Sequence, residues 1–208
     1  MSGLAVCLSS PFVELSGRAM VVTGASSGIG AATARLAHSQ GARVVLAARR
    51  AERLASLVDE LPGSLAVRTD VTQKAELTAL RDRALQAFGA IDVLVNNAGQ
   101  GLHLPLTEVD ADDFRAIWEL NVVAPLTLMQ AVLPTMAPQG HGAIVNVSSM
   151  TSLMAIPRLG AYAATKSALN SLSQVARKEF APMGLSYRWS IRGSPKPSFT
   201  DRCGPESL

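Results

Sequence analysis

The first glycine-rich turn of the sequence is Thr23-Gly24-Ala25-Ser26-Ser27-Gly28-Ile29-Gly30, which joins the apolar run Ala19–Thr23 to a segment with helical spacing over residues 31–40. We expect Gly24 to allow the sharp turn out of a strand and Gly28 to let the backbone approach an anion. Gly30 would let the helix pack closely on that strand. The free N–H groups and the positive dipole end of the helix would then bind a phosphate group.

The spacing of this turn is G-x3-G-x-G, and no Lys-Ser/Thr pair closes it as in a Walker loop. A tight strand-to-helix turn without any ligand is the alternative interpretation. The position of the turn at the first strand–helix junction favours binding of a dinucleotide pyrophosphate.

Short apolar runs and segments with helical spacing alternate along the rest of the chain. The runs after Ala19–Thr23 cover residues 43–47, 65–69, 91–96 and 143–147. Because the runs are continuously apolar, we expect strands that are buried on both faces. Strands that alternate with helices predict a parallel sheet covered on both sides and joined by right-handed crossovers. The sequence therefore predicts a single-domain, doubly wound α/β fold with ligands beyond the carboxyl ends of the strands.

Length and charge exclude several classes of protein. The chain has 208 residues, of which 48% are hydrophobic, so it can bury the core of one domain and is not disordered. Residues 1–176 hold 13 basic and 13 acidic side chains, and the whole positive surplus lies in residues 177–208. Without a basic stripe that could follow a phosphate backbone, we expect no nucleic-acid partner.

Cysteine usage and one uncharged segment bear on location and assembly. Cys7 and Cys203 are too few for a disulfide framework or a metal site, which predicts a reduced, cytoplasmic protein without bound metal.

Residues 120–157 contain no Asp, Glu, Lys or Arg. Proline, asparagine and glutamine interrupt this segment, so it is expected to be buried core or subunit interface and not a membrane span.

The second predicted strand ends in Ala47-Ala48-Arg49-Arg50. A dinucleotide with a free 2′-OH on its adenine ribose usually meets an acidic residue here. Arg49 instead suits a 2′-phosphate, which a guanidinium group can bind with two hydrogen bonds. The alternative is that Arg49 and Arg50 only begin a solvated helix. We interpret the pattern as favouring NADP over NAD.

Tyr162 and Lys166 are four residues apart and therefore share one face of a predicted helix. A lysine ammonium near a phenol favours the phenolate, which allows tyrosine to exchange a proton near neutral pH. Ser149 follows a buried apolar run, at the sheet edge where ligands bind, and can hydrogen-bond a substrate oxygen. An ordinary amphipathic helix surface also shows the Tyr-x-x-x-Lys pattern, so the pair gains its meaning from the other motifs.

Taken together, these motifs resemble those of the short-chain dehydrogenase/reductase family. The resemblance extends from about residue 15 to about residue 187 and is carried by the turn at residues 23–30, Asp70-Val71, Asn96-Asn97-Ala98-Gly99, Asn121, Ser149 and Tyr162…Lys166. It implies a Rossmann-like sheet and an NADP-dependent oxidoreductase that interconverts a carbonyl and a secondary alcohol. It also implies a small-molecule substrate and pairing as a homodimer or homotetramer.

The resemblance further implies which residues bind the cofactor. Those around the pyrophosphate and ribose are Gly24, Ser26, Ser27, Gly28, Ile29 and Gly30. Asp70 would accept a hydrogen bond from the adenine amino group while Val71 packs beside the ring. The cofactor floor would be formed by Asn97, Ala98 and Gly99. An N-cap role for Asp70 is the alternative.

Four residues would carry out catalysis by the same resemblance. Ser149 would orient the substrate oxygen, and Tyr162 would exchange its proton while hydride moves between substrate and cofactor. Lys166 would bind the nicotinamide ribose, and Asn121 would hold a water behind Lys166. A plain buried amide in a helix is the alternative for Asn121.

The resemblance weakens towards the C-terminus. Residues 185–192 alternate apolar with polar and predict a two-faced strand, but the Pro-Gly pair that family members carry next is absent. We therefore divide the chain into an N-terminal extension at 1–14, a Rossmann-like domain at 15–187 and a divergent polar and basic tail at 188–208, and we expect the last strand or strands to be missing or altered. A catalytically impaired nucleotide- or partner-binding protein is the alternative function.

Overall fold

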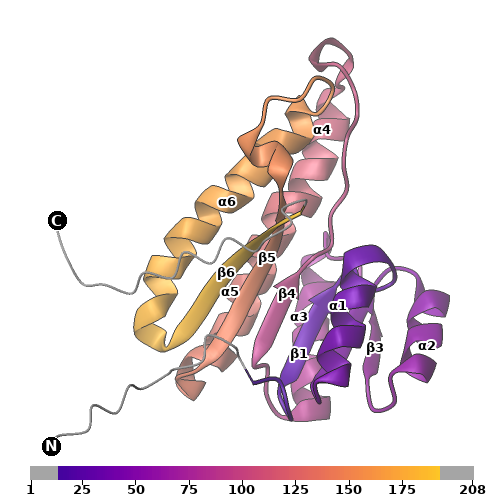
Figure 1. The fold of residues 1–208 in the computed structure, drawn as a ribbon, viewed down its shortest axis with the longest axis vertical. Coiled ribbons are helices and arrows are strands. Elements are labelled where there is room, and N and C mark those ends of the chain that lie inside the picture. Colours follow the sequence, from indigo (N-terminus) through magenta and orange to yellow (C-terminus); the bar gives the residue numbers. More distant parts are fainter. Residues whose placement is uncertain (1–13, 193–208) are drawn as a thin grey trace, which may run out of the picture.

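The computed structural model describes residues 14–192, which form a six-stranded parallel sheet (Figure 1). The strands lie in the order β3-β2-β1-β4-β5-β6. They are β1 (Ala19–Thr23), β2 (Arg43–Ala48), β3 (Leu65–Arg68), β4 (Val93–Asn96), β5 (Gly142–Ser149) and β6 (Leu185–Arg192). The order reverses between β1 and β4, so the carboxyl ends of these strands flank the switch point at which doubly wound sheets bind ligands. The predicted doubly wound fold is confirmed.

In residues 14–192, six α-helices connect and cover the strands. They are α1 (Gly28–Ser39), α2 (Ala51–Glu60), α3 (Lys74–Phe88), α4 (Ala111–Trp118), α5 (Ala124–Met136) and α6 (Gly160–Phe180). Within the described part of the chain, α1 and α2 lie on one face of the sheet, and α3, α5 and α6 lie on the other (Figure 1). Adjacent residues of β1 enter opposite cores, Val21 on the α3 side and Val22 on the α1 side. Such two-sided burial explains the continuously apolar strands.

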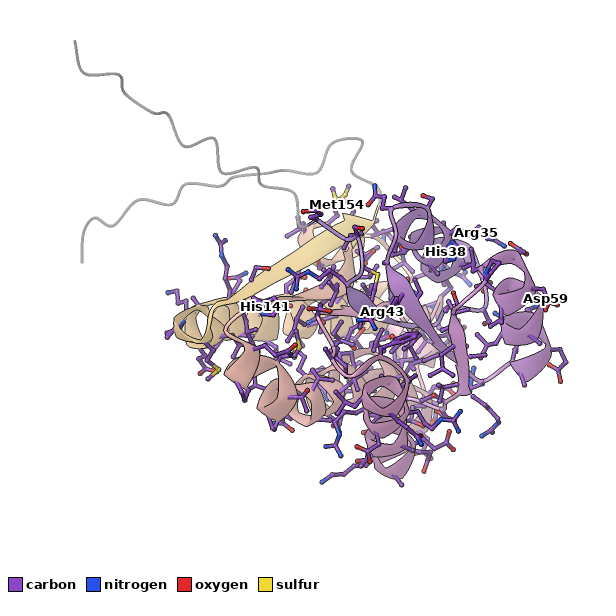
Figure 2. The ribbon with its side chains drawn as sticks, turned by 90° about the horizontal axis from the view of Figure 1, so that it is seen from below. Arg35, His38, Arg43, Asp59, His141 and Met154 are labelled. Atoms are coloured by element: carbon purple, nitrogen blue, oxygen red, sulfur yellow. The ribbon has the colours of Figure 1, made fainter. Side chains whose placement is uncertain are left out.

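Helices α1 and α2 are joined to each other by polar contacts at their exposed sides. Arg35 and His38 of α1 lie on the side of the molecule that also presents Asp59 of α2 (Figure 2). Arg35 Nε donates to Glu60 Oε2 over 2.8 Å, and His38 Nε2 lies 2.9 Å from the Pro62 carbonyl oxygen. Exposed ion pairs of this kind contribute little to stability, so apolar burial accounts for most of the packing here.

The opposite layer is fixed by a buried polar chain that crosses two strands and a helix. Asn96 Nδ2 on β4 donates to Asn146 Oδ1 on β5 over 2.9 Å, and Asn146 Nδ2 donates to Ser173 Oγ on α6 over 3.1 Å. All three side chains are buried. Because leaving one such partner unpaired is costly, this chain holds α6 in a defined position against the sheet.

The helical segment Ala111–Gln139 is long and apolar enough to cross a membrane by length and composition. In the fold the buried side chains of its α5 part belong to the core on the α3 side. Val132 and Met136 have no exposed surface, and Leu128 and Met129 are 1% exposed. The segment is a core helix of the sheet, as its interrupted composition predicts.

Strand β6 runs from Leu185 to Arg192 and pairs in parallel with β5 over its full length. A strand is therefore present where the alternating pattern predicts one. It also crosses the boundary at 187/188 between the predicted domain and the predicted tail. The remainder of the tail, residues 193–208, and the extension up to residue 13 lie outside the described residues.

Candidate active site

The glycine-rich turn after β1 leaves open space where an anion would bind. Gly24 and Gly28 have φ of +65° and +56°, in the region that favours glycine. A Cβ on Gly24 would lie 2.8 Å from Asn97 Nδ2, and one on Gly30 would collide with the Gly24 carbonyl. A Cβ on Gly28 would meet nothing within 4 Å. Gly24 and Gly30 thus permit close packing, whereas Gly28 faces open space.

Helix α1 begins inside this turn, at Gly28, three residues before the predicted start. Ser27 is its N-cap, but its side chain makes no capping hydrogen bond, and no acidic residue lies in the first turn. The N–H groups of that first turn, which includes Ile29 and Gly30, are therefore not covered by a capping side chain. An uncapped helix start beside open space is suited to a phosphate group.

Thr23 connects the glycine-rich turn to the end of β4, a role that the sequence analysis did not assign. Its Oγ1 accepts hydrogen bonds from the N–H groups of Asn97 and Ala98 over 3.0 and 3.1 Å. In return, Asn97 Nδ2 donates to the Thr23 and Gly24 carbonyls over 2.9 and 3.3 Å. These bonds hold the two carboxyl ends of the strands together at the switch point.

The two arginines after β2 take different positions. Arg50 Nη2 donates to Ser26 Oγ and Ser27 Oγ over 2.8 and 2.7 Å, so its guanidinium lies against the glycine-rich turn. Arg49 lies near enough to Asp70 for its charge to act on that carboxylate. Both arginines thus border the predicted adenosine side of the site, but only Arg49 was predicted from the sequence.

Asp70 lies in the turn between β3 and α3, where its side chain accepts hydrogen bonds from within the turn. Its Oδ1 accepts from the Thr72 N–H over 3.1 Å and from Thr72 Oγ1 over 2.8 Å. Gln73 is the N-cap of α3, so the alternative N-cap role for Asp70 is wrong. Burial raises the pKa of Asp70, but the hydrogen bonds from Thr72 and the charges of Arg49 and Arg68 outweigh this, so that its pKa lies below the ordinary value. Asp70 is thereby kept as a carboxylate acceptor.

Val71 and Ala98 line the same small pocket, beside Thr23 at the end of β1 and Asn96 at the end of β4. Val71 is 8% exposed. The structure therefore brings together the residues that the resemblance places at the adenine ring and at the cofactor floor.

Tyr162 and Lys166 both lie on α6, beside the end of β5. Lys166 Nζ donates to the Val147 carbonyl over 2.8 Å and lies 5.9 Å from the centroid of the Tyr162 ring. Lys166 is only 4% exposed. A buried ammonium group needs compensating partners. The fold therefore holds Lys166 Nζ in a defined position next to the Tyr162 phenol.

Ser149 is the last residue of β5, at the edge that the sequence predicts. Its Oγ accepts from the N–H and the Oγ1 of Thr151, over 3.3 and 2.9 Å. Ser149 Oγ accepts both of these bonds, so among residues 14–192 the proton of its hydroxyl remains available to a substrate oxygen.

Asn121 lies in a π-helical turn, Glu119–Val123, between α4 and α5. Turns of this kind are frequent at functional sites. The side chain is fully buried, donates to the Gln100 carbonyl over 2.9 Å and to Thr165 Oγ1 over 3.1 Å, and accepts from the Gln100 N–H over 3.0 Å. The side chain thus holds the loop after β4 against α6, and the water-binding role that the resemblance implies stays a prediction.

A cleft of about 300 Å³ lies among these elements. It is lined by Asn97, Gly99, Gln100, Gly101, Val147, Ser148, Tyr162 and Lys166. Two of its buried polar atoms, Asn97 Oδ1 and Ser148 Oγ, have no hydrogen-bond partner among residues 14–192. Gly99 is in close contact here, since a Cβ would lie 2.9 Å from Asn121 Oδ1.

Buried polar atoms without partners are costly, so the cleft suits a ligand with hydroxyl or amide groups. A ribose carries such hydroxyls, and the uncapped start of α1 suits a pyrophosphate. The residues present therefore fit a nicotinamide dinucleotide that spans from the glycine-rich turn to Lys166.

Comparison with known proteins identifies the family. The family model described as short chain dehydrogenase matches residues 18–189. The chain therefore belongs to the short-chain dehydrogenase/reductase family, a family of NAD(P)-dependent oxidoreductases.

Relatives from two Staphylococcus species are named as oxidoreductases. An uncharacterized oxidoreductase of Staphylococcus aureus (strain MW2) is 38% identical over 173 residues, which cover 82% of this chain and 75% of that protein. An uncharacterized oxidoreductase of Staphylococcus saprophyticus is 39% identical over 178 residues, which cover 83% of this chain and 76% of the relative.

Solved structures have the same fold. A short-chain dehydrogenase from Streptomyces avermitilis superposes with a TM-score of 0.79 at 38% identity, covering 84% of this chain and 64% of that one. A member from Burkholderia phymatum in complex with NAD gives a TM-score of 0.82 at 35% identity, covering 86% of this chain and 66% of that one. A metagenomic member in complex with NADP gives 0.79 at 38% identity, covering 86% and 82% of the two chains. Similar structures thus hold either nicotinamide dinucleotide.

Proposed function

We propose that this protein interconverts a carbonyl and a secondary alcohol with NADP, and that Tyr162 is its general acid and base. The observation that carries the proposal is the buried ammonium group of Lys166, held by Val147 next to the Tyr162 ring on the wall of the cleft. On the surface of an ordinary amphipathic helix, water would surround both side chains. The lysine would then have no functional effect on the tyrosine.

In the reductive direction, NADPH would supply a hydride to the carbonyl carbon when bound. Tyr162 Oη gives its proton to the carbonyl oxygen, which becomes the hydroxyl of the alcohol, and the Tyr162 phenolate remains. The Lys166 ammonium stabilises this negative charge. The Ser149 hydroxyl donates to the same substrate oxygen and orients it. In the oxidative direction the Tyr162 phenolate accepts the proton.

The preference for NADP rests on two cationic side chains at the adenosine side. Arg50 is held by Ser26 and Ser27, and the charge of Arg49 reaches Asp70. A 2′-phosphate would complete charge-assisted hydrogen bonds with these guanidinium groups. NAD carries no 2′-phosphate and would offer these groups no such bonds.

Exposed apolar side chains follow Ser149 and support a substrate with an apolar portion. Leu153 is 64% exposed, Met154 53% and Ile156 38%, and Met154 stands out at the surface in Figure 2. These residues lie between the catalytic serine and α6. A carbonyl with an aliphatic or aromatic substituent would cover part of this surface.

The first experiment is thermal unfolding of the purified chain with NADPH and, separately, with NADH. A ligand that binds only the folded protein raises the unfolding midpoint. We expect a clear rise with NADPH and a smaller one with NADH. Turnover of a panel of aldehydes and ketones with NADPH then tests the reaction. A midpoint that neither cofactor moves would contradict the proposed function.

Two further proposals accompany this function. Apolar side chains on the outer helices, such as Trp118 of α4 and Val175 of α6, are 38% and 51% exposed, which supports pairing with a second copy of the chain. Light scattering would test this, and a folded monomer at micromolar concentration would contradict it. The reduced, cytoplasmic location stays a prediction from cysteine usage.

A further inference from the structure

The short helical turn after β5, Met150–Leu153, is hydrogen-bonded to α6 at Ser152. Asn170 Nδ2 on α6 donates to Ser152 Oγ over 2.8 Å, and Ser167 Oγ on α6 donates to the Ser152 carbonyl over 3.2 Å. Ser152 Oγ in turn donates to the Ser149 carbonyl over 2.6 Å. Helix α6 is thereby connected to the backbone of the catalytic serine.

The direction of these hydrogen bonds is determined by the single proton of the Ser152 hydroxyl. A carbonyl oxygen only accepts, so the Ser152 proton must lie towards Ser149. Ser152 Oγ must then accept from Asn170, which sets the orientation of that amide. Asn170 is 8% exposed, so water does not readily replace it as a donor.

Asn170 occupies the next position of the stripe that already carries the catalytic pair. Tyr162, Lys166 and Asn170 are four and eight residues apart on α6, so they lie on one face of the helix. One rigid element thus carries the phenol, the ammonium group and the amide that holds the turn after Ser149.

We propose that Asn170 is a positioning residue that acts through Ser152 to place the Ser149 hydroxyl relative to Tyr162, an inference that rests on the proposed function. The hydroxyl moves with the turn, because Ser149 Oγ accepts its hydrogen bonds from Thr151 within that turn. A displacement of about 1 Å in a reacting group can lower a rate by about 100-fold.

The test compares kcat, KM and cofactor binding in N170A, N170D, S152A and S152T. We expect N170A and S152A to lower kcat by about 10-fold or more while the dissociation constant of NADPH stays within about twofold of the wild-type value. The carboxylate in N170D would draw the Ser152 proton away from Ser149, so this nearly isosteric variant should lower kcat as well. S152T keeps the hydroxyl and should retain most activity.

Gln174→Ala is the matched control, because Gln174 is an exposed amide on the same helix. It should leave kcat unchanged. Variants N170A and S152A that bind NADPH and keep the wild-type kcat would overturn the proposal. If N170A does not fold, the result for S152A decides whether the proposal holds. This variant should fold, since it removes only one hydroxyl group from a partly exposed turn.

Hydrogen exchange of the Thr151 amide tests positioning without turnover. We expect this amide to exchange at least about 10-fold faster in N170A and S152A than in the wild type and in Q174A, since its acceptor is Ser149 Oγ. If the wild type shows no turnover, the proposed function fails while this measurement still judges the positioning role. Unchanged exchange in both variants would refute it.

Discussion

Arg50 and Ser27 are joined by a hydrogen bond of 2.7 Å between Nη2 of the arginine and Oγ of the serine. The bond places a guanidinium group directly beside the start of α1, where an anion would bind. Arg49, one residue earlier, lies instead towards Asp70. The two neighbouring arginines therefore approach the adenosine side of the cofactor site from different directions.

We predict that R49A and R50A each reduce kcat/KM for NADPH by about 10-fold or more and change kcat/KM for NADH much less. A lost charge-assisted hydrogen bond of about 1.5–3 kcal/mol accounts for such a change. Steady-state kinetics with both cofactors measures it. R53A removes an exposed arginine from α2 and serves as the control. An unchanged ratio of the two cofactors in R49A and R50A would refute the assignment of a 2′-phosphate site.

Replacement of Tyr162 by phenylalanine should abolish most turnover while leaving the cofactor bound. Loss of a general acid typically lowers a rate by about 10²–10⁴-fold. The Lys166 ammonium keeps its bond to the Val147 carbonyl in this variant, so we expect the NADPH-induced rise in unfolding midpoint to persist. Single-turnover rates and thermal unfolding, taken together, separate the two effects. Wild-type turnover in Y162F would show that the assigned mechanism is wrong.

Asp70 should make the stability of the protein depend on acid pH. Its pKa is lower in the folded chain than the ordinary value of 3.8, because hydrogen bonds from Thr72 and the charges of Arg49 and Arg68 outweigh the effect of burial. The unfolded chain therefore binds this proton more readily. The stabilisation is fully present above 3.8 and is lost as pH falls through the folded pKa.

We expect D70N to be less stable than the wild type at pH 7 and to lose less further stability as pH falls below 4. Urea unfolding at a series of pH values measures both changes. E108Q, at an exposed acidic position far from this turn, is the control. Parallel pH dependences of the wild type and D70N would contradict the role given to Asp70.

Periodicity and turn chemistry predict the strands of this fold well, because burial on both faces leaves a plain signal in sequence. Strand β1 has its predicted bounds, whereas β5 extends over Gly142–Ser149 and exceeds the predicted 143–147 at both ends. Within this strand the polar Asn146 is buried by its hydrogen bonds with Asn96 and Ser173. Such long-range pairing has no local sequence signal.

The candidate site, too, could be predicted in part from local sequence and in part could not. Its members could be chosen by motif, but their contacts could not, since Asn121 bonds partners 21 and 44 residues away. Arg49 and Arg50 are neighbours in sequence, and only the backbone at the start of α2 decides which of them faces the glycine-rich turn. Thr23, Ser152 and Asn170 carry no motif of their own and emerge only from the folded arrangement.

Alanine substitutions at Gly28, Gly30 and Gly63 offer a last test, because they separate the effect of backbone strain from the effect on anion binding. Gly28 and Gly63 both have positive φ, +56° and +83°, and an added Cβ at either would meet nothing within 4 Å. Alanine at each position should therefore destabilise the fold by a similar amount, about 1–2 kcal/mol. Only G28A adds a methyl group in the open space beside the start of α1, so only G28A should abolish the rise in unfolding midpoint caused by NADPH. G30A should instead destabilise the fold more strongly, since its Cβ would collide with the Gly24 backbone. If G28A and G63A both retain the NADPH-induced rise, the anion does not bind at Gly28, and the glycine-rich turn serves packing alone.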